Sequence, residues 1–278
     1  MPKIKKVLFP VDFSERCFGA ARYVEALAGR FEAELLLLHV VEFGDRALIP
    51  QLEQTRKHQL DEFLEDELKH YTTKRLCLLG DPAVKIVETV RSWEPDLVMM
   101  PTFGVGFYRR MLLGSVTTKI LHDVECPVWT DVHAEQAPPL EKIVCSRVLC
   151  AVGLDQRSSC VLKWAQFLAD EYQAKLSIVH AVPAAVTAGP TYALDQEYAS
   201  YLAQDAAKRI EDLQQSAGSK AAAIIAAGSP VEVVTKAAHE FGADLLILGR
   251  HGRGGPLGHL RQNAYSILRD SPCPAISI

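Results

Sequence analysis

The amino-acid sequence predicts two α/β domains in tandem, each a doubly wound sheet of five parallel strands with helices on both faces. The chain has 278 residues, the length of two ordinary domains, and 49% of them are hydrophobic, which is enough for two cores. The sequence contains an internal duplication: Val7–Glu42 aligns without a gap on Val148–Pro183, and Gly80–Gly106 aligns on Gly228–Gly254. Within each copy, short apolar runs alternate with amphipathic segments, as in parallel strands joined by helical crossovers.

Five short apolar runs in the first copy are expected to be buried strands. They are Val7–Val11, Leu35–Val41, Arg75–Leu79, Leu97–Met100 and Val128–Thr130. The segments between them have helical signals, with Ser14 as an N-cap and Pro82 in a first turn. The expected helices are Ser14–Phe31, a segment over about 52–70, Pro82–Ser92 and Ser115–Asp123.

The second copy repeats this order, with its second helix near Asp195–Ser216. Between the copies, the pair Pro138–Pro139 within His133–Lys142 indicates a linker. We therefore expect a first domain over residues 1–132, a linker over 133–145 and a second domain over 146–278.

Composition and charge argue against several classes of protein. The net charge of −4 argues against a general nucleic-acid binder. The longest apolar run is far shorter than the ~20 residues of a membrane helix, and no signal peptide is recognised. The seven cysteines are odd in number and none has CxxC spacing, so we expect a reduced, cytoplasmic protein without a disulfide framework or zinc knuckle.

Two loops in each copy lie where a ligand is expected, beyond the carboxyl ends of the first and fourth strands. After the first strand, the first copy has Asp12, whose carboxylate could accept hydrogen bonds from a ribose or hold a metal. The alternative, a helix cap or turn residue, is equally open. The second copy has Gly153 at the aligned position and Asp155 two residues later, so this role need not carry over.

The loop after the fourth strand of the first copy has the features of a phosphate site. Gly104 and Gly106 let the backbone approach a ligand closely. Gly114 and Ser115 open the next helix, whose free N–H groups and positive dipole end favour an anion. Arg109 could lie over phosphates, or could be a solvated loop residue. A P-loop is excluded because GxxxxGK[ST] does not occur, and GxGxxG fails in both copies.

Both copies resemble the universal stress protein family, in its tandem form. The resemblance rests on VDFSE (Val11–Glu15), LLHV (Leu37–Val40), LLGSV (Leu112–Val116) and CPV (Cys126–Val128). The family's motif is G-x2-G-x9-G-[ST] after strand four, with an Asp after strand one, and in ATP-binding members these hold the nucleotide. The resemblance implies a Rossmann-like five-stranded sheet and dimerisation through the last strand. In a tandem chain that contact would join the two copies as a pseudo-dimer, and a further homodimer is open.

The resemblance further implies that the first copy binds ATP, with or without Mg²⁺. Pro101 departs from the motif, because it replaces the first glycine, fixes φ and removes an N–H. The implied nucleotide-binding residues are Pro10, Val11, Asp12, Ser14, Val40, Met100, Gly104, Gly106, Arg109, Gly114, Ser115, Val116 and Thr117.

The second copy departs further from the motif. Its Gly–Ser pair is replaced by Gln262 and Asn263, or by Arg261 and Gln262 if the closing Cys-Pro is aligned instead. We therefore expect one nucleotide site, in the first copy, and a degenerate second copy. A weaker second site would comprise Gly249, Arg250, Gly252 and Arg253, whose arginines keep the loop electropositive or are solvated.

The expected function is that of a stress-response protein that binds an adenine nucleotide as a binding or switch module, with weak ATP hydrolysis at most. The alternative is a scaffold that binds no nucleotide and acts through protein contacts, because both motifs are damaged. An enzyme on the same scaffold is disfavoured, since neither an SGGxDS-like nor a HIGH-like signature is present. We interpret His39 and His180 as packed strand-end residues rather than bases.

Overall fold

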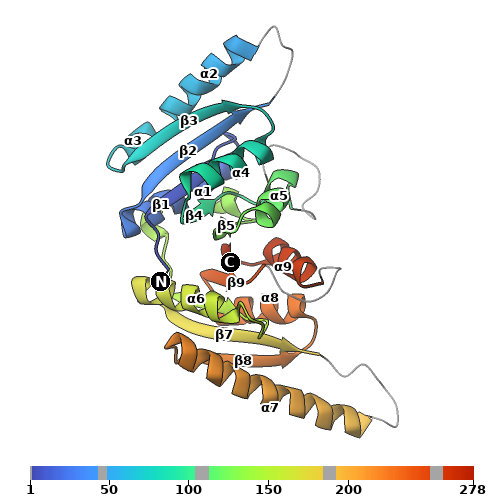
Figure 1. Ribbon diagram of the computed structural model, residues 1–278. Helices are drawn as coiled ribbons and strands as arrows, with labels where there is room; N and C mark the ends of the chain where they lie inside the picture. Colours follow the sequence, from blue (N-terminus) through green and yellow to red (C-terminus); the bar gives the residue numbers. More distant parts are fainter. Residues whose placement is uncertain (1, 43–48, 104–112, 184–191, 251–258) are drawn as a thin grey trace. The chain divides into compact units, whose positions relative to one another are not determined.

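The computed structural model describes residues 2–42, 49–103, 113–183, 192–250 and 259–278. The chain divides into two compact units, a first half, Lys3–Ile143, and a second half, Val144–Ile278. In each half, strands and helices alternate along the chain (Figure 1).

The first half is a parallel sheet in the order β3-β2-β1-β4-β5. Residues 35–38 of β2 are at most 6% exposed, as a strand covered on both faces requires. The predicted doubly wound sheet is confirmed. The elements are β1 (Lys6–Pro10), α1 (Glu15–Phe31), β2 (Glu34–Val41), α2 (Ile49–Glu62), α3 (Glu65–Leu68), β3 (Thr73–Leu79), α4 (Pro82–Trp93), β4 (Leu97–Met99), α5 (Ser115–Asp123) and β5 (Val128–Thr130).

The second half repeats the same topology in the order β8-β7-β6-β9-β10. Its core is formed by apolar residues of β6 and β9, with Val148, Leu149 and Leu246 fully buried. The elements are β6 (Arg147–Ala151), α6 (Ser158–Tyr172), β7 (Lys175–Val182), α7 (Tyr192–Ala217), β8 (Ala222–Ala227), α8 (Pro230–Phe241), β9 (Leu245–Leu248), α9 (His259–Asp270) and β10 (Ala275–Ser277).

The duplication extends to individual backbone contacts. Asp96 accepts two hydrogen bonds from backbone N–H groups at the start of β1, and Asp244 accepts two at the start of β6. The third residue after the first strand of each half, Phe13 or Leu154, is left-handed, with φ of 60° and 55°. Because such a φ is uncommon outside glycine, its recurrence shows that both copies make the same turn after their first strand.

The segment expected to be a linker packs on the first half. It forms two 3₁₀ turns, Ala134–Gln136 and Leu140–Lys142. Ala134 is fully buried against α1, and a β-carbon on Gly19 would fall 1.7 Å from its carbonyl oxygen. Arg22 of α1 donates a hydrogen bond to the carbonyl of Ala137. Residues 134–137 therefore form a strap on α1.

The single helix expected over about 52–70 is divided in two. Leu64 lies between α2 and α3 in the left-handed region, with φ of 54°. Arg75 of β3 donates hydrogen bonds of 2.9 and 3.0 Å to the carbonyl groups of Leu60 and Phe63, which satisfies the end of α2. Periodicity does not reveal this break, because the stabilising side chain comes from the following strand.

Candidate functional site

Both halves reverse their strand order at the first strand of the copy. In the first half β1 lies between β2 and β4, and in the second half β6 lies between β7 and β9. In open parallel sheets, ligands bind outside the carboxyl ends of the strands at this point. A ligand is therefore expected at the loops that follow β1 and β4 in the first half, and at those that follow β6 and β9 in the second half.

The loop after β1 is a capping structure. The Oδ1 atom of Asp12 accepts hydrogen bonds from the backbone N and the Oγ of Ser14, at 3.0 and 2.7 Å. Ser14 is the predicted N-cap, and its Oγ accepts from the backbone N of Cys17 at 3.2 Å. The Cys17 thiol also interacts with the Asp12 carboxylate through a side-chain hydrogen bond, which contributes to the raised pKa of Cys17. Asp12 is thus a turn residue whose carboxylate is engaged by Ser14 and Cys17.

The loop after β4 leads to the N-terminus of α5. Gly114 is the N-cap, and the first hydrogen bond of the helix runs from Thr118 N to Gly114 O at 2.8 Å. The amide groups of Ser115, Val116 and Thr117 precede this bond and have no partner within the helix. Ser115 is exposed, so its hydroxyl can add a donor to these amide groups.

Gly114 lies close to the backbone of the preceding loop at this N-cap. Its N–H donates to the carbonyl of Thr102 at 2.9 Å, and a β-carbon there would lie 3.2 Å from the same oxygen. The Thr117 hydroxyl donates to the carbonyl of Pro101 at 3.2 Å and is buried. The Thr117 side chain therefore holds the loop, and only its backbone N–H is suited to contact a ligand.

Pro101 does not break the pairing with β5. Its neighbours Met100 and Thr102 donate their N–H groups to the carbonyls of Trp129 and Asp131, at 3.1 and 3.2 Å. Because successive residues of an extended chain point to opposite sides, the absent N–H of Pro101 falls on the side away from β5. Gly104, Gly106 and Arg109 lie outside the described residues, as do Gly252 and Arg253 of the second half.

His39 and His180 lie at the ends of β2 and β7 and act as structural donors. The Nδ1 of His39 donates to the carbonyl of Val11 at 2.7 Å, and that of His180 donates to Val152 at 2.8 Å. Burial lowers the pKa of both imidazoles below 6.5, so the neutral ring is favoured. The interpretation of both as packed strand-end residues is confirmed.

Helix α2 and the residue after it bring side chains to this edge that the sequence analysis did not place there. The Phe13 ring lies 4.6 Å from the His39 ring and 5.5 Å from the Phe63 ring, measured between centroids. The guanidinium carbon of Arg56 lies 6.0 Å from the Phe13 centroid, within cation–π range. The available signal was the helical spacing of Leu60, Phe63 and Leu64, which did not show that this face meets the loop after β1.

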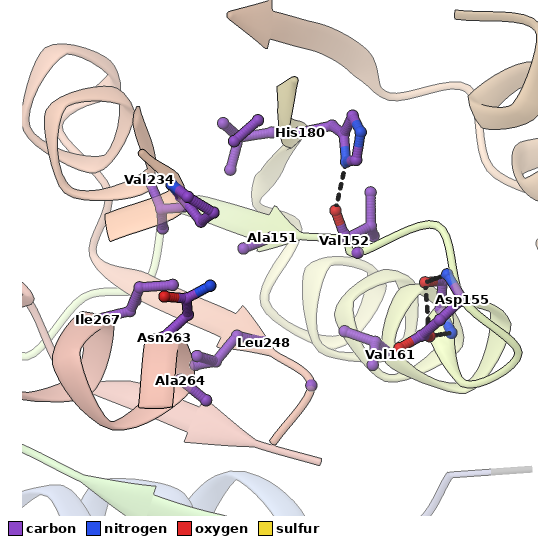
Figure 2. A pocket seen from close by; sticks show the side chains of 16 residues that line it. Ala151, Val152, Asp155, Val161, His180, Val234, Leu248, Asn263, Ala264 and Ile267 are labelled. Carbon is purple, nitrogen blue, oxygen red and sulfur yellow. Dashed lines mark hydrogen bonds between the residues drawn. The ribbon is translucent and has the colours of Figure 1, made fainter. Parts of the chain in front are cut away.

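The second half has a cavity of about 180 Å³ at its carboxyl edge (Figure 2). The residues that line it are Ala151, Val152, Gly153, Asp155, Ser158, Val161, Val179, His180, Ala181, Pro230, Val234, Leu248, Gly249, Asn263, Ala264 and Ile267. Gly249 and Arg250 are the described members of the predicted weaker second site, and of these two Gly249 lines the cavity.

Arg250, predicted to keep this loop electropositive, is buried and points elsewhere. Its Nη1 donates to the carbonyl oxygen and the Oγ of Ser277 in β10, at 2.7 and 3.1 Å, and only 3% of the residue is exposed. Its guanidinium group is therefore bonded to β10 at the end of the sheet. No signal near Arg250 in the sequence indicates Ser277 as its partner.

The chain matches the universal stress protein family over residues 3–131 and again over residues 145–277. It belongs to that family. Two curated relatives correspond to about half of it. The universal stress protein MJ0531 of Methanocaldococcus jannaschii is 29% identical over 135 residues, which are 45% of this chain and 79% of that protein. MJ0577 of the same organism is 25% identical over 149 residues, 45% of this chain and 92% of that protein.

Solved structures of the family's fold match nearly the whole chain. A universal stress protein from Archaeoglobus fulgidus aligns with a TM-score of 0.73 at 20% identity, covering 98% of this chain and 97% of that one. A functionally unknown protein, PA1789, from Pseudomonas aeruginosa aligns with a TM-score of 0.69 at 17% identity, covering 99% and 92%. At this level of identity they show the fold alone.

Among the described residues, no group of three or more His, Cys, Asp or Glu side chains is arranged to hold a metal ion. None of the described helices is both long and apolar enough to cross a membrane.

Proposed function

We propose that the first half binds an adenine nucleotide, ATP, and that the protein works as a binding or switch module of the stress response. The observation that supports this most is the start of α5 at Ser115, beside the strand-order reversal, with amide groups that no helical carbonyl satisfies. The family resemblance implies the same residues for the phosphates.

In the proposed complex, the phosphates would meet the amide groups of Ser115, Val116 and Thr117 and the exposed Ser115 hydroxyl. Arg109 would add positive charge from the loop before α5, as the family resemblance implies. The carboxylate of Asp12 would accept a further hydrogen bond from the ribose. The backbone at Pro10, Val11, Val40 and Met100 would border the base.

A magnesium ion would arrive with the nucleotide rather than occupy a site of its own. Mg²⁺ in nucleotide sites takes most of its ligands from phosphates and water, and one or two from protein carboxylates. Asp12 is the carboxylate available for this purpose in the loop after β1. Because it is a single carboxylate already engaged with Ser14, we expect weak dependence of affinity on the metal.

Catalysis is not part of the proposal beyond weak hydrolysis. A general base must have a free acceptor near the water it activates. The Nδ1 of His39 is engaged with the Val11 carbonyl, and the ring packs against Phe13. This arrangement supports a structural role for the histidine at the edge of the site.

Isothermal titration of the full chain with ATP and Mg²⁺ tests the proposal, with a denatured parallel sample examined for co-purified nucleotide. We expect a stoichiometry near one. Ser115→Glu places a carboxylate on an exposed position where the phosphates would lie, so it should abolish the binding heat. Asn263→Glu, at the aligned position of the second half, is the matched control and should leave the ATP isotherm unchanged.

Two results would change the assignment. A stoichiometry near two would mean that the second half binds ATP as well. No heat and no released nucleotide would overturn the proposal in favour of the scaffold that acts through protein contacts. The cytoplasmic location and the pairing of the halves through their last strands stay predictions, and light scattering of the purified chain would test for a further homodimer.

A further inference from the structure

The strap that packs on α1 is also joined to the loop after β4, because Arg16 of α1 contacts both. Its Nε donates to the Glu135 carboxylate of the strap at 3.0 Å. Its guanidinium carbon lies 5.2 Å from the centroid of the Phe103 ring, within cation–π range. The side chains of Arg16 and Glu135 are 25% and 28% exposed, so this ion pair is largely shielded from water. One guanidinium group therefore connects the strap to the loop.

Phe103 adjoins the helix start at which the phosphates of the proposed nucleotide would lie. A β-carbon on Gly114, the N-cap of α5, would fall 3.6 Å from the Cα of Phe103. Gly114 also donates its N–H to the carbonyl of Thr102, the residue before Phe103, at 2.9 Å. A displacement of Phe103 would therefore shift the backbone on which the first turn of α5 is placed.

A second connection runs through Asp131, which lies between β5 and the strap. Its carbonyl oxygen accepts hydrogen bonds from the N–H and the hydroxyl of Thr102, at 3.2 and 3.0 Å. Its carboxylate accepts a hydrogen bond of 2.9 Å from the backbone N of His133, the residue directly before the strap. Asp131 is only 3% exposed, so water does not readily replace these bonds. The strap is thus joined to the loop after β4 by two routes.

The strap has few anchors and can therefore leave α1 as a unit. The methyl groups of Ala134 and Ala137 are buried, Arg22 donates to the carbonyl of Ala137, and Arg16 pairs with Glu135. Segments with so few contacts open locally before the rest of a domain unfolds. Opening of the strap would break the Arg16–Glu135 pair and release the turn at His133, which lie behind the two connections to the loop.

We propose that docking of the strap on α1 and binding of ATP at the start of α5 favour each other, with Arg16 as the positioning residue between them. This inference rests on the nucleotide site proposed for the first half and adds a regulation of that site. By linkage, the factor that docking adds to the affinity for ATP is also the factor that ATP adds to docking. Because the strap belongs to the connection between the halves, ATP would control the length of free chain in that connection.

Hydrogen exchange of the full chain, measured by mass spectrometry, tests docking without a variant. The amide groups of Gln136 and Ala137 are bonded to the carbonyls of His133 and Ala134, at 2.8 and 3.1 Å, and exchange when the strap opens. We expect saturating ATP with Mg²⁺ to slow this exchange by about fivefold or more, the lower end of typical couplings between sites. In Ser115→Glu, which should not bind ATP, the nucleotide should leave the exchange unchanged.

Releasing the strap should weaken ATP binding, measured by titration calorimetry. We expect about fivefold or more for Gly19→Ala, whose new β-carbon would meet the carbonyl of Ala134. The matched control is Gly29→Ala, on the same helix, which should bind ATP like the wild type.

Glu135→Ala separates the role of Arg16 from a purely structural one. Loss of the ion pair should weaken ATP binding by about twofold or more, whereas Gln136→Ala, at the exposed next position, should not. In an Arg16→Gln background, Glu135→Ala should have no further effect, because both changes act through the same guanidinium group. Additive losses would overturn the role of Arg16.

The outcomes distinguish this inference from the nucleotide site itself. If the wild type binds no ATP, the nucleotide site is wrong and the linkage is wrong with it. If ATP binds but does not slow exchange in the strap, or if Gly19→Ala and Glu135→Ala bind it like the wild type, the linkage alone is overturned. Tighter binding after release of the strap overturns it as well. If Gly19→Ala does not fold, Glu135→Ala and the exchange of the wild type decide the proposal.

Discussion

Replacing Gly19 by alanine should destabilise the first half, although the same change normally stabilises a helix. Gly19 is in the interior of α1, where alanine is favoured over glycine by about 1 kcal/mol. Its β-carbon would fall 1.7 Å from the carbonyl oxygen of Ala134, a backbone atom that no side-chain rotation can move. The strap formed by residues 134–137 must therefore leave α1.

The cost can be worked from the contacts of the strap. The hydrogen bond from Arg22 to the carbonyl of Ala137 is worth about 1 kcal/mol. Exposing the buried methyl groups of Ala134 and Ala137 costs about 0.8 kcal/mol each. The ion pair between Arg16 and Glu135 adds up to about 1 kcal/mol. After the gain in helix propensity, the net loss of unfolding free energy is about 2 kcal/mol.

Urea unfolding measures this loss. Trp93 and Trp129 belong to the first half, so a Trp164→Phe background makes tryptophan fluorescence report on that half alone. Gly29→Ala is the matched control in the same helix, because its β-carbon meets only the end of the Tyr71 side chain, at 3.0 Å. We expect Gly29→Ala to be neutral or stabilising. If Gly19→Ala also raises the unfolding midpoint, the packing of the strap on α1 is wrong.

Three further predictions follow from the contacts described. Asp81→Ala should lower the unfolding free energy by about 1 kcal/mol, because the Asp81 carboxylate caps α4 with a hydrogen bond of 2.8 Å. Ser229→Ala, at the matching cap of α8, should cost less because Ser229 makes no side-chain capping bond. Equal losses of free energy in urea titrations would contradict this. Burial lowers the pKa of His39 in the folded state, so the contribution of the neutral ring to stability is fully present above pH 6.5 and is lost as the pH falls through the folded pKa. His39→Gln should flatten the resulting decrease of the urea midpoint between pH 7.5 and 5. An unchanged slope of midpoint against pH would refute the assignment. Burial, together with the neighbouring Asp12 charge, raises the pKa of Cys17 to about 12. Iodoacetamide at about pH 8 should therefore modify the exposed Cys160 and leave Cys17 unmodified in the folded protein, as measured by peptide mass spectrometry. Equal labelling of the two cysteines would contradict the burial of Cys17.

The fold could be predicted from the sequence because its signals are local and repeated. The apolar run of β2 lies within eight residues, and the Ser14 cap lies directly before α1. Each of these patterns depends on neighbours along the chain, and the duplication supplied a second, independent copy of most of them. The end of α2 could not be predicted in the same way, because Arg75 reaches back to it from β3.

The candidate site could be predicted in part for a related reason. Gly114 and Ser115 are consecutive residues at the start of a helix, so this helix start could be recognised from the sequence as a possible anion site. The hydrogen-bond partner of Arg250, Ser277, lies 27 residues further along the chain. The cavity at Asn263 depends on the residue at which α9 begins. The gapless alignment of the copies matched Gln262 and Asn263 to Gly114 and Ser115, whereas α9 already begins at His259, one turn before Asn263.

The earlier start of α9 sets a limit on how the two halves can exchange roles. In the first half the partnerless amide groups come from the position at which α5 begins, and a change of side chain cannot create them elsewhere. Restoring a serine at Asn263 would add a hydroxyl inside an uninterrupted helix. A single substitution can therefore change the side chain at position 263, but only a deletion or a helix break would place partnerless amide groups there.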